Sequence, residues 1–225
     1  MPRPELPRPA IVGTISDFAT FSRLAAGEVP DGADLVELRL DQHMDLAEAR
    51  RLAPLVSRHL PVMLTIRTCR EGGSWEIDDR DRLELFRSFF GLVEIFDIEI
   101  ESPLFAATGR SDFPAEAIVV TSFHDYQGIP APDRLAGLLA KAERWGADIA
   151  KLACRAANPA EAEAYARLLD LPRPKPLCLI AMGDAVCRTR YDFPKRGSAL
   201  TYGWLDRPAA PGQPSAKELA EHLRG

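Results

Sequence analysis

Eight short apolar runs follow one another along the chain at a spacing of about 28 residues, with amphipathic segments between most of them. Several runs are rich in Val and Ile, as strands buried on both faces of a parallel sheet are. Eight strands that alternate with helices are typical of a single (β/α)8 TIM barrel, an α/β fold, and 225 residues make a compact one. The expected strands are residues 10–16, 34–41, 61–67, 94–100, 116–123, 148–154, 176–182 and 199–205.

The segments between the strands include several with helical periodicity, namely residues 44–56, 78–90, 132–146, 158–170 and 214–224. Asp45 is a candidate N-cap for the first segment. The third and fourth segments open with a proline near the first helical position, where an N–H group would be unpaired anyway. A doubly wound sheet is the alternative fold, but no GxGxxG follows any strand. Because the chain has no linker or low-complexity segment, we expect one domain over residues 1–225.

Charge and composition exclude several classes of function. The net charge of −5 and the lack of a Lys/Arg run argue against nucleic-acid binding. No apolar run reaches 18 residues, so we expect no membrane-spanning segment. The first ten residues lack the apolar segment of a secretory signal, so we expect a cytoplasmic protein. The cysteines form no CxxC pair and the histidines are scattered, so we expect reduced thiols and no metal site. The four cysteines are Cys69, Cys154, Cys178 and Cys187.

Charged side chains interrupt the apolar runs at alternate positions, which places them on one face of a strand. In a barrel one face points inward, and chemistry is found at the C-terminal ends of the strands. Arg67 ends the third run before a loop that carries Glu71, while Ser122 and His124 share a face at the end of the fifth run. The other aligned positions are Glu37, Arg39 and Asp41 in the second run and Asp97, Glu99 and Glu101 in the fourth.

Lys151 is the most unusual of these residues, because it lies inside the apolar run "DIAKLAC" of a chain with only five lysines. A buried ammonium without a partner is costly, so the structural alternative is a lysine that reaches solvent from the strand end. Glu37, Arg39 and Asp97 could form a buried ion-pair layer, and His124 could be an ordinary core histidine. Their convergence favours an enzyme in which Lys151 forms a Schiff base with a carbonyl and His124 carries protons.

Eight short motifs, taken together, resemble one known family. In order they are "ELRLD", "IRTCREGG", "DIEIE", "TSFHDY", "DIAKLA", "MGDAVCRTR", "GSALTY" and "APGQ", and they extend over nearly the whole chain. Each motif is weak alone. All eight in sequence and at barrel spacing resemble type I 3-dehydroquinate dehydratase, the Schiff-base enzyme of the shikimate pathway.

This resemblance implies a reaction and a role for three residues. Lys151 would form an imine with the C3 ketone of 3-dehydroquinate. His124 would remove a C2 proton and then protonate the departing C1 hydroxyl. This syn elimination of water would give 3-dehydroshikimate without a metal or cofactor. Glu71 matches the carboxylate that orients the histidine.

The resemblance also implies a set of substrate-binding residues. Arg190, rather than the nearby Arg188, aligns with the arginine that clamps the substrate carboxylate, a task that suits its planar guanidinium. Gln213 matches a contact from a closing loop, although it could serve its Pro-Gly turn alone. Ser198 either caps a turn or strand or donates to an anion. The remaining positions are Glu37, Arg39 and Arg67 for the ring hydroxyls, Met182 and Tyr202 for the pocket wall, and Thr14, where the family often has a serine.

Two positions depart from the family pattern. Ala209 stands where the family has Ser or Thr before "APGQ", and Val186 stands where a glycine follows "MG". We expect these changes to affect substrate affinity and lid contacts rather than the reaction. Because the family often forms dimers, the resemblance also implies a homodimer as one assembly to test.

Two other functions stay open. A class I aldolase is also a Schiff-base barrel enzyme, but it needs a glycine-rich phosphate site after the last two strands, and residues 183–198 offer only scattered glycines. A non-catalytic barrel that binds a metabolite of the same pathway would lack the lysine or the histidine, and both are present. The sequence therefore favours the dehydratase.

Overall fold

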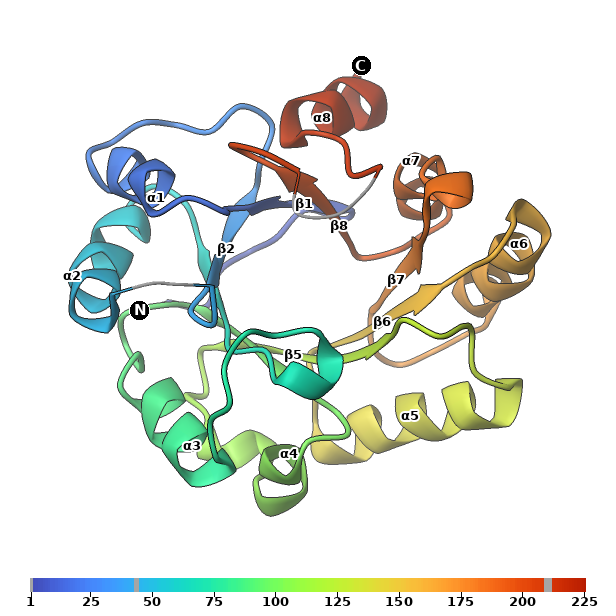
Figure 1. Cartoon of the computed structure of the whole chain (residues 1–225), viewed down its shortest axis with the longest axis horizontal. Coiled ribbons are helices and arrows are strands. Elements are labelled where there is room, and N and C mark those ends of the chain that lie inside the picture. Colours follow the sequence, from blue (N-terminus) through green and yellow to red (C-terminus); the bar gives the residue numbers. More distant parts are fainter. Residues whose placement is uncertain (1, 43–44, 209–211) are drawn as a thin grey trace.

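The computed structural model describes residues 2–42, 45–208 and 212–225. Within them, parallel strands form one sheet in the order β7-β6-β5-β4-β3-β2-β1-β8, and the helices surround the rolled sheet (Figure 1). Every predicted run overlaps one strand, so the predicted (β/α)8 TIM barrel is confirmed. The strands are β1 (Ala10–Thr14), β2 (Leu35–Arg39), β3 (Val62–Thr65), β4 (Ile95–Glu99), β5 (Ile118–Asp125), β6 (Ile149–Arg155), β7 (Leu177–Met182) and β8 (Leu200–Trp204).

Most helices begin at the signals found in the sequence. Asp45 caps its helix by accepting hydrogen bonds from two backbone N–H groups, and Pro132 and Pro159 each stand in the first turn of theirs. The α-helices are α1 (Phe18–Ala25), α2 (Leu46–Val56), α3 (Asp79–Arg87), α4 (Pro103–Ala107), α5 (Pro132–Trp145), α6 (Pro159–Ala166), α7 (Thr189–Lys195) and α8 (Ala216–Arg224). The 3-10 helices are η1 (Cys69–Glu71), η2 (Arg110–Asp112), η3 (Arg167–Asp170) and η4 (Asp184–Val186). Helices α1, α4 and α7 lie outside the segments predicted to be helical.

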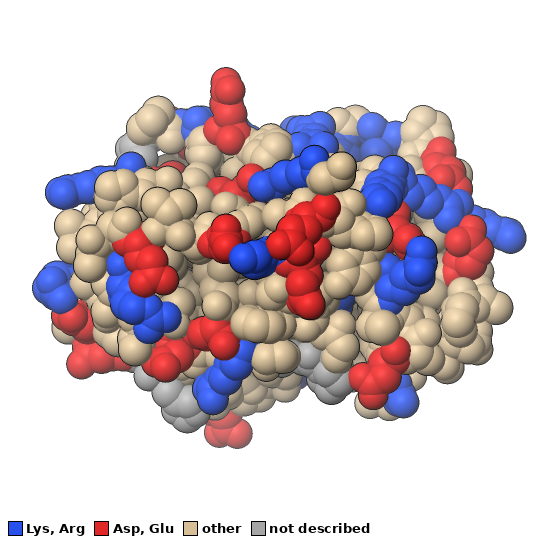
Figure 2. Space-filling view, turned by 90° about the horizontal axis from the view of Figure 1, so that it is seen from above, with Lys and Arg blue, Asp and Glu red and all other residues tan. Residues whose placement is uncertain are grey.

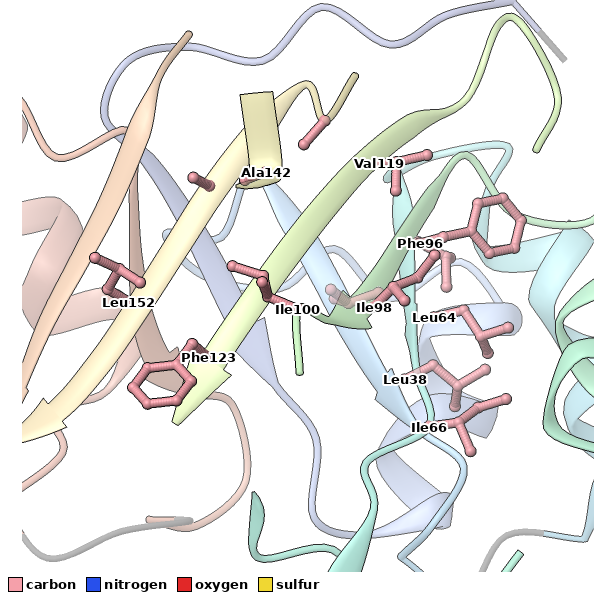
Figure 3. Packing of buried hydrophobic residues seen from close by; sticks show 14 of the residues in the cluster. Leu38, Leu64, Ile66, Phe96, Ile98, Ile100, Val119, Phe123, Ala142 and Leu152 are labelled. Carbon is pink, nitrogen blue, oxygen red and sulfur yellow. The ribbon is translucent and has the colours of Figure 1, made fainter. Parts of the chain in front are cut away.

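The core has two layers, because successive side chains of a strand point to opposite faces. The outer layer lies between the strands and the helices, and Figure 3 shows part of it, including Leu38, Leu64 and Phe96. The inner layer fills the barrel and includes Val12, Leu35, Met63, Ile95, Val120, Ile149, Cys178 and Leu200. Further along the same strands the inward positions become polar, and the candidate site is found there.

The barrel closes between β7 and β8 with the help of a side chain. In the described residues these two strands are the ends of the hydrogen-bonded order. The N–H of Ala199 donates to the carbonyl of Leu177 (2.8 Å). The Ser198 hydroxyl accepts from the N–H of Leu179 (2.9 Å) and donates to the carbonyl of Leu200 (3.0 Å). A hydroxyl therefore replaces part of the backbone ladder at this β7–β8 seam.

Residues 2–9, which we call the N-terminal strap, lie against the end of the barrel at which the strands begin. Arg3 donates to the carbonyl of Ala117 (3.0 Å) and to the carboxylate of Asp148 (2.7 Å), which precede β5 and β6. Leu6 is half-buried and packs against the inner core layer. The strap therefore covers the end of the barrel opposite to the polar positions.

Charges of both signs are interspersed on the face of the molecule that Figure 2 shows. A search of the described residues finds no helix with the length and apolarity that a membrane span needs.

Candidate active site

Lys151 is buried inside the barrel. The residue is 2% exposed, and its Nζ lies 3.1 Å from Oδ2 of Asp97 on β4. The same ammonium lies 4.3 Å from the ring centroid of Tyr202 on β8, a cation–π contact. The structural alternative, a lysine that reaches solvent, is therefore wrong. This ammonium has a buried counter-ion and an aromatic neighbour instead.

Asp97 is held as a carboxylate by the groups around it. Its Oδ1 accepts a hydrogen bond from the Ser122 hydroxyl on the neighbouring strand β5. Burial alone would raise the pKa of Asp97, but the charges of Lys151 and Arg67 and the Ser122 hydrogen bond hold that pKa below its ordinary value. Asp97 is therefore a fixed negative charge beside the lysine.

His124 pairs with Glu71 one inward position above Lys151. The register of β5 and β6 places Ser122 beside Lys151 and His124 beside Ala153, so the histidine lies closer to the C-terminal ends of the strands. Nδ1 of His124 lies 2.7 Å from Oε2 of Glu71, and both residues are 7% exposed. The register brings lysine, histidine and carboxylate to one end of the barrel.

Burial shifts the pKa values of this pair in opposite directions. It raises the pKa of Glu71 to about 9, and the negative charge of Glu99 adds to the shift. It lowers the pKa of His124 well below its ordinary value, and the Arg67 charge acts in the same direction. Both shifts disfavour the charged forms of the two groups. The imidazole is therefore neutral near pH 7.

The turn after β3 presents Glu71 because two glycines follow it. Gly72 has a φ of 86°, which favours a residue without a side chain. A Cβ on Gly73 would lie 1.9 Å from the carbonyl oxygen of Arg67. The Tyr126 hydroxyl donates to the carbonyl of Glu71 (3.2 Å) from the loop after β5. The "REGG" sequence therefore fixes a carboxylate against His124.

Three arginines bring positive charge to this end of the barrel, and their partners differ. Asp41 accepts hydrogen bonds from Nε (2.8 Å) and Nη2 (2.7 Å) of Arg39. Arg67 is buried, and its Nε has no hydrogen-bond partner among the described residues. Arg190, on α7, is half-buried and forms no ion pair with any residue that the structure describes. Arg67 and Arg190 are therefore the arginines most available to an anion.

Glu37 has a different partner from the one considered in the sequence analysis. Its Oε1 accepts a hydrogen bond from the Thr65 hydroxyl (2.9 Å) on β3. Arg39 instead pairs with Asp41, so the structure does not contain the Glu37–Arg39 ion pair of the structural alternative.

The segment after β8 returns to the end of the barrel through Gln213, which is 8% exposed. The Gln213 amide donates to Oγ1 of Thr14 at the end of β1 (3.1 Å), and Nε1 of Trp204 donates to the Gln213 carbonyl (3.1 Å). Asp206 accepts a hydrogen bond from the N–H of Asp17 (2.8 Å), the N-cap of α1. Gln213 and Thr14, which were predicted to belong to one site, are therefore in contact.

The other predicted site residues are placed as follows. Met182 ends β7 and Tyr202 lies in β8 beside Lys151. Ser198 precedes β8, and its hydroxyl bonds to the backbone at the β7–β8 seam, as the capping alternative expects. Val186 is buried in η4. Ala209 lies outside the described residues.

The model of the family described as Type I 3-dehydroquinase matches residues 20–224. The chain belongs to the type I 3-dehydroquinase family. Among its relatives, the 3-dehydroquinate dehydratase of Methanothrix thermoacetophila is 36% identical over 220 residues, which are 96% of this chain and 91% of the relative.

Solved structures agree with this membership of the type I 3-dehydroquinase family. The crystal structure of the 3-dehydroquinate dehydratase from Aquifex aeolicus matches with a TM-score of 0.76 and 31% identity, over 96% of this chain and 97% of that one. The 3-dehydroquinate dehydratase from Geobacillus kaustophilus matches with a TM-score of 0.82 over 96% of this chain and 90% of that one. At 24% identity this second likeness shows the fold alone.

Asp97, Ser122 and Arg82 were not among the catalytic or substrate-binding residues predicted for this type I 3-dehydroquinase. Spacing placed Asp97 and Ser122 on inward faces, but only the side-chain contacts show that Asp97 binds both Lys151 and the Ser122 hydroxyl. Arg82 is completely buried, yet it occurs in the charged sequence "DDRDR", which is typical of a solvent-exposed helix end. No sequence signal distinguished it.

Proposed function

We propose that this type I 3-dehydroquinase removes water from 3-dehydroquinate through a Schiff base on Lys151, with His124 as the proton carrier. The observation that carries the proposal is a buried lysine, paired with Asp97, one inward position from a neutral histidine held by Glu71. A lysine amine is a nucleophile toward ketones, and a neutral imidazole both accepts and returns a proton.

The covalent step joins Nζ of Lys151 to C3 of the substrate. The Lys151 ammonium first loses a proton, the neutral amine adds to the C3 ketone, and the resulting carbinolamine loses its oxygen as water. The C=N bond that remains carries a proton, and His124 supplies and removes the protons of these steps. Asp97, which lies 3.1 Å from the lysine nitrogen, is the counter-ion of the iminium as it was of the ammonium.

The iminium makes the C2 proton acidic, because the C2–H electron pair moves into the C=N bond and gives an enamine. Once the Glu71–His124 pair has lost its shared proton, Nδ1–H of His124 faces the Glu71 carboxylate at 2.7 Å and Nε2 takes the C2 proton. The enamine then expels the C1 hydroxyl, which receives the proton from His124 and leaves as water. Hydrolysis of the imine releases 3-dehydroshikimate and regenerates the Lys151 amine.

Substrate recognition follows from charge and position. The Arg190 guanidinium binds the substrate carboxylate, since a planar fork matches two carboxylate oxygens. We assign the other contacts to Glu37, Arg39 and Arg67 for the ring hydroxyls, to Met182 and Tyr202 for the pocket wall, and to Gln213 with Thr14 at the closing segment.

In this proposal residues 1–225 act as one catalytic unit in the cytoplasm. The iminium is the electron sink, so the proposed steps use no metal or cofactor. The buried thiols of Cys154 and Cys178 are consistent with a reducing compartment. Light scattering of the purified protein measures whether it forms the homodimer that the family resemblance implies.

Borohydride trapping tests the proposal. We expect 3-dehydroquinate and borohydride to leave one reduced adduct by intact mass, which peptide mapping places on Lys151. Lys151→Ala removes the adduct, whereas Lys217→Ala, at an exposed lysine of α8, keeps it. The proposal is contradicted if the folded protein gives no adduct while a known Schiff-base enzyme is trapped in the same run. An adduct with dihydroxyacetone phosphate instead would favour the aldolase.

A further inference from the structure

Another buried ion pair, Arg82–Glu99, lies near the Glu71–His124 pair and has no part in the proposed chemistry. Arg82 of α3 is 0% exposed and Glu99, at the end of β4, is 3% exposed. Nη2 of Arg82 lies 2.8 Å from Oε2 of Glu99. Removal of two charges from water costs free energy that their attraction does not reliably return. Stability alone is therefore a poor explanation for this pair.

Both members of the pair hold the turn that follows β3. Nε of Arg82 donates to the carbonyl of Ile66 (3.0 Å). Oε1 of Glu99 accepts from the backbone N–H of Thr68 (2.9 Å) and from the Thr68 hydroxyl (3.1 Å). The ion pair therefore fixes two backbone positions where the chain leaves the strand.

Thr68 links this pair to Glu71. The carbonyl of Thr68 accepts hydrogen bonds from the N–H of Glu71 (3.1 Å) and from the N–H of Gly73 (2.8 Å). Thr68 is also the N-cap residue of η1, the single turn that carries Glu71. One residue therefore joins the Glu99 carboxylate to the backbone of Glu71.

We propose that Arg82 and Glu99 are positioning residues, which hold Glu71 against His124 by fixing Thr68. Neither has a part in the proposed contacts with the substrate, and the kinetic part of this inference rests on the proposed function. A histidine that transfers protons depends on the group that orients it, and displacement of such a group by about 1 Å lowers turnover by about 100-fold.

Glu99 also acts on the pair through its charge. After burial, its carboxylate is the strongest influence that raises the pKa of Glu71. Removal of this charge therefore lowers the pH at which the Glu71–His124 pair loses a proton. The other charges that act on the pair are Arg39 of β2, Arg67 after β3, Asp97 of β4 and Lys151 of β6. Glu71, Glu99 and His124 line a cavity of about 650 Å³, which also carries the charged residues Arg70, Asp79, Glu101, Asp125 and Arg134.

Glu99→Gln is the first test of the inference. The glutamine keeps an acceptor for Thr68 but removes the charge and weakens the contact with Arg82. We expect kcat to fall by about 10-fold to 100-fold. We expect the ascending limb of kcat/KM against pH to move to lower pH by about one unit. ¹⁵N NMR of histidine-labelled protein should show the same shift in the ring of His124.

The NMR measurement separates this inference from the proposed function, because it needs no turnover. A wild-type protein without dehydratase activity would contradict the proposed function, and the His124 titration in Glu99→Gln would still test the positioning role. Glu94→Gln is the matched control. Glu94 is a buried carboxylate that immediately precedes β4, at the opposite end of the strand from Glu99. It accepts a hydrogen bond from the N–H of Val62 (2.9 Å). We expect this variant to leave the titration of His124 unchanged.

Thr68→Val is a second test that keeps every charge in place. It removes the hydroxyl that donates to Glu99 and retains the backbone N–H, so it tests the inference even where Glu99→Gln does not fold. We expect a lower kcat with an unchanged ascending limb. The inference is wrong if Thr68→Val keeps full kcat. It is also wrong if folded Glu99→Gln shows the wild-type titration of His124 and the wild-type kcat.

Discussion

Lys151 and Asp97 show how single residues keep charge inside a barrel of apolar strands. Each is the counter-ion of the other, and both oxygens of Asp97 are used, one by the lysine and one by Ser122. The ring of Tyr202 adds a cation–π contact on the lysine nitrogen. Loss of either charge would leave the other buried without compensation, which is strongly destabilising. The two residues are therefore a structural unit as well as part of the candidate site.

Glu71→Gln tests the role of the carboxylate that orients His124. The glutamine oxygen still accepts the Nδ1–H hydrogen bond, so the tautomer is kept, but no negative charge stabilises the imidazolium. We expect kcat to fall by about 100-fold. In the wild type, the pKa of Glu71 is raised, so the Glu71–His124 pair gives up its shared proton only at high pH. Without that carboxyl group, only the low pKa of His124 matters, so the ascending limb of the pH profile should move to lower pH.

The control for this substitution is Glu76→Gln, an exposed carboxylate five positions along the same loop. It should leave both kcat and the pH profile unchanged. A wild-type pH profile in Glu71→Gln would show that the Glu71 carboxyl group does not control the proton of the pair.

At the residue scale, sequence spacing predicted the candidate site where a strand has an inward face. Lys151, His124 and Glu37 all follow the period of two, and the structure brings them to one end of the barrel. Ser198 could not be placed this way, because it precedes its strand and its hydroxyl serves the backbone. Arg82 could not be found either, because burial of a helix residue depends on which neighbour packs over it.

Among the elements, the turn between β3 and α3 has the most demanding backbone. A Cβ at Gly73 would lie 1.9 Å from the Arg67 carbonyl oxygen, a distance that no side chain tolerates. Gly73→Ala must therefore move the turn that carries Glu71. We expect kcat to fall by about 100-fold, because the carboxylate leaves its position against His124. Steady-state kinetics together with the ¹⁵N spectrum of His124 measure the effect.

Gly137→Ala is the matched control for this substitution. Gly137 lies within α5, and a Cβ there meets no atom within 4 Å. The alanine should raise the free energy of unfolding by about 0.5–1 kcal/mol through helix propensity and leave kcat unchanged. Equal kcat values for the two alanine variants would contradict the role given to the turn.

Elements were predictable in proportion to their length and periodicity. The strands were found because short apolar runs recur at regular intervals, and helices such as α2 and α5 because they span three turns or more. Helix α4 has five residues and α7 has seven with Pro194 inside, so neither offers enough turns for a pattern to emerge. Packing against the barrel, which the sequence does not display, is what stabilises such short helices.

For the whole molecule, the N-terminal strap closes the end of the barrel that carries no candidate chemistry. Leu6 packs against the inner core layer, so Leu6→Ala should lower the free energy of unfolding by about 1 kcal/mol, a fraction of the value for a fully buried leucine. Because the strap lies at the opposite end from Lys151, kcat should not change. Urea denaturation and steady-state kinetics on the same preparation check both expectations.

Leu171→Ala is the matched control, since Leu171 is 56% exposed. Its effect on the free energy of unfolding should stay within about 0.5 kcal/mol. A strap that served only as a loose tail would make the two substitutions equivalent, and a fall in kcat for Leu6→Ala would show that the two ends of the barrel are coupled.

The β7–β8 seam has a mechanical consequence. A barrel whose strands are all joined by full hydrogen-bond ladders resists twisting much better than a barrel with one weak joint. Here the joint between β7 and β8 is held by a serine hydroxyl and few backbone hydrogen bonds. Torsion of the barrel is therefore concentrated as shear along this line. Helix α7 contacts both β7 and β8 and carries Arg190. The Arg190 guanidinium, proposed to hold the substrate carboxylate, therefore lies on a helix that bridges the joint between strands that shears most easily. Lys151 and His124 instead lie on strands that have hydrogen-bonded neighbours on both sides.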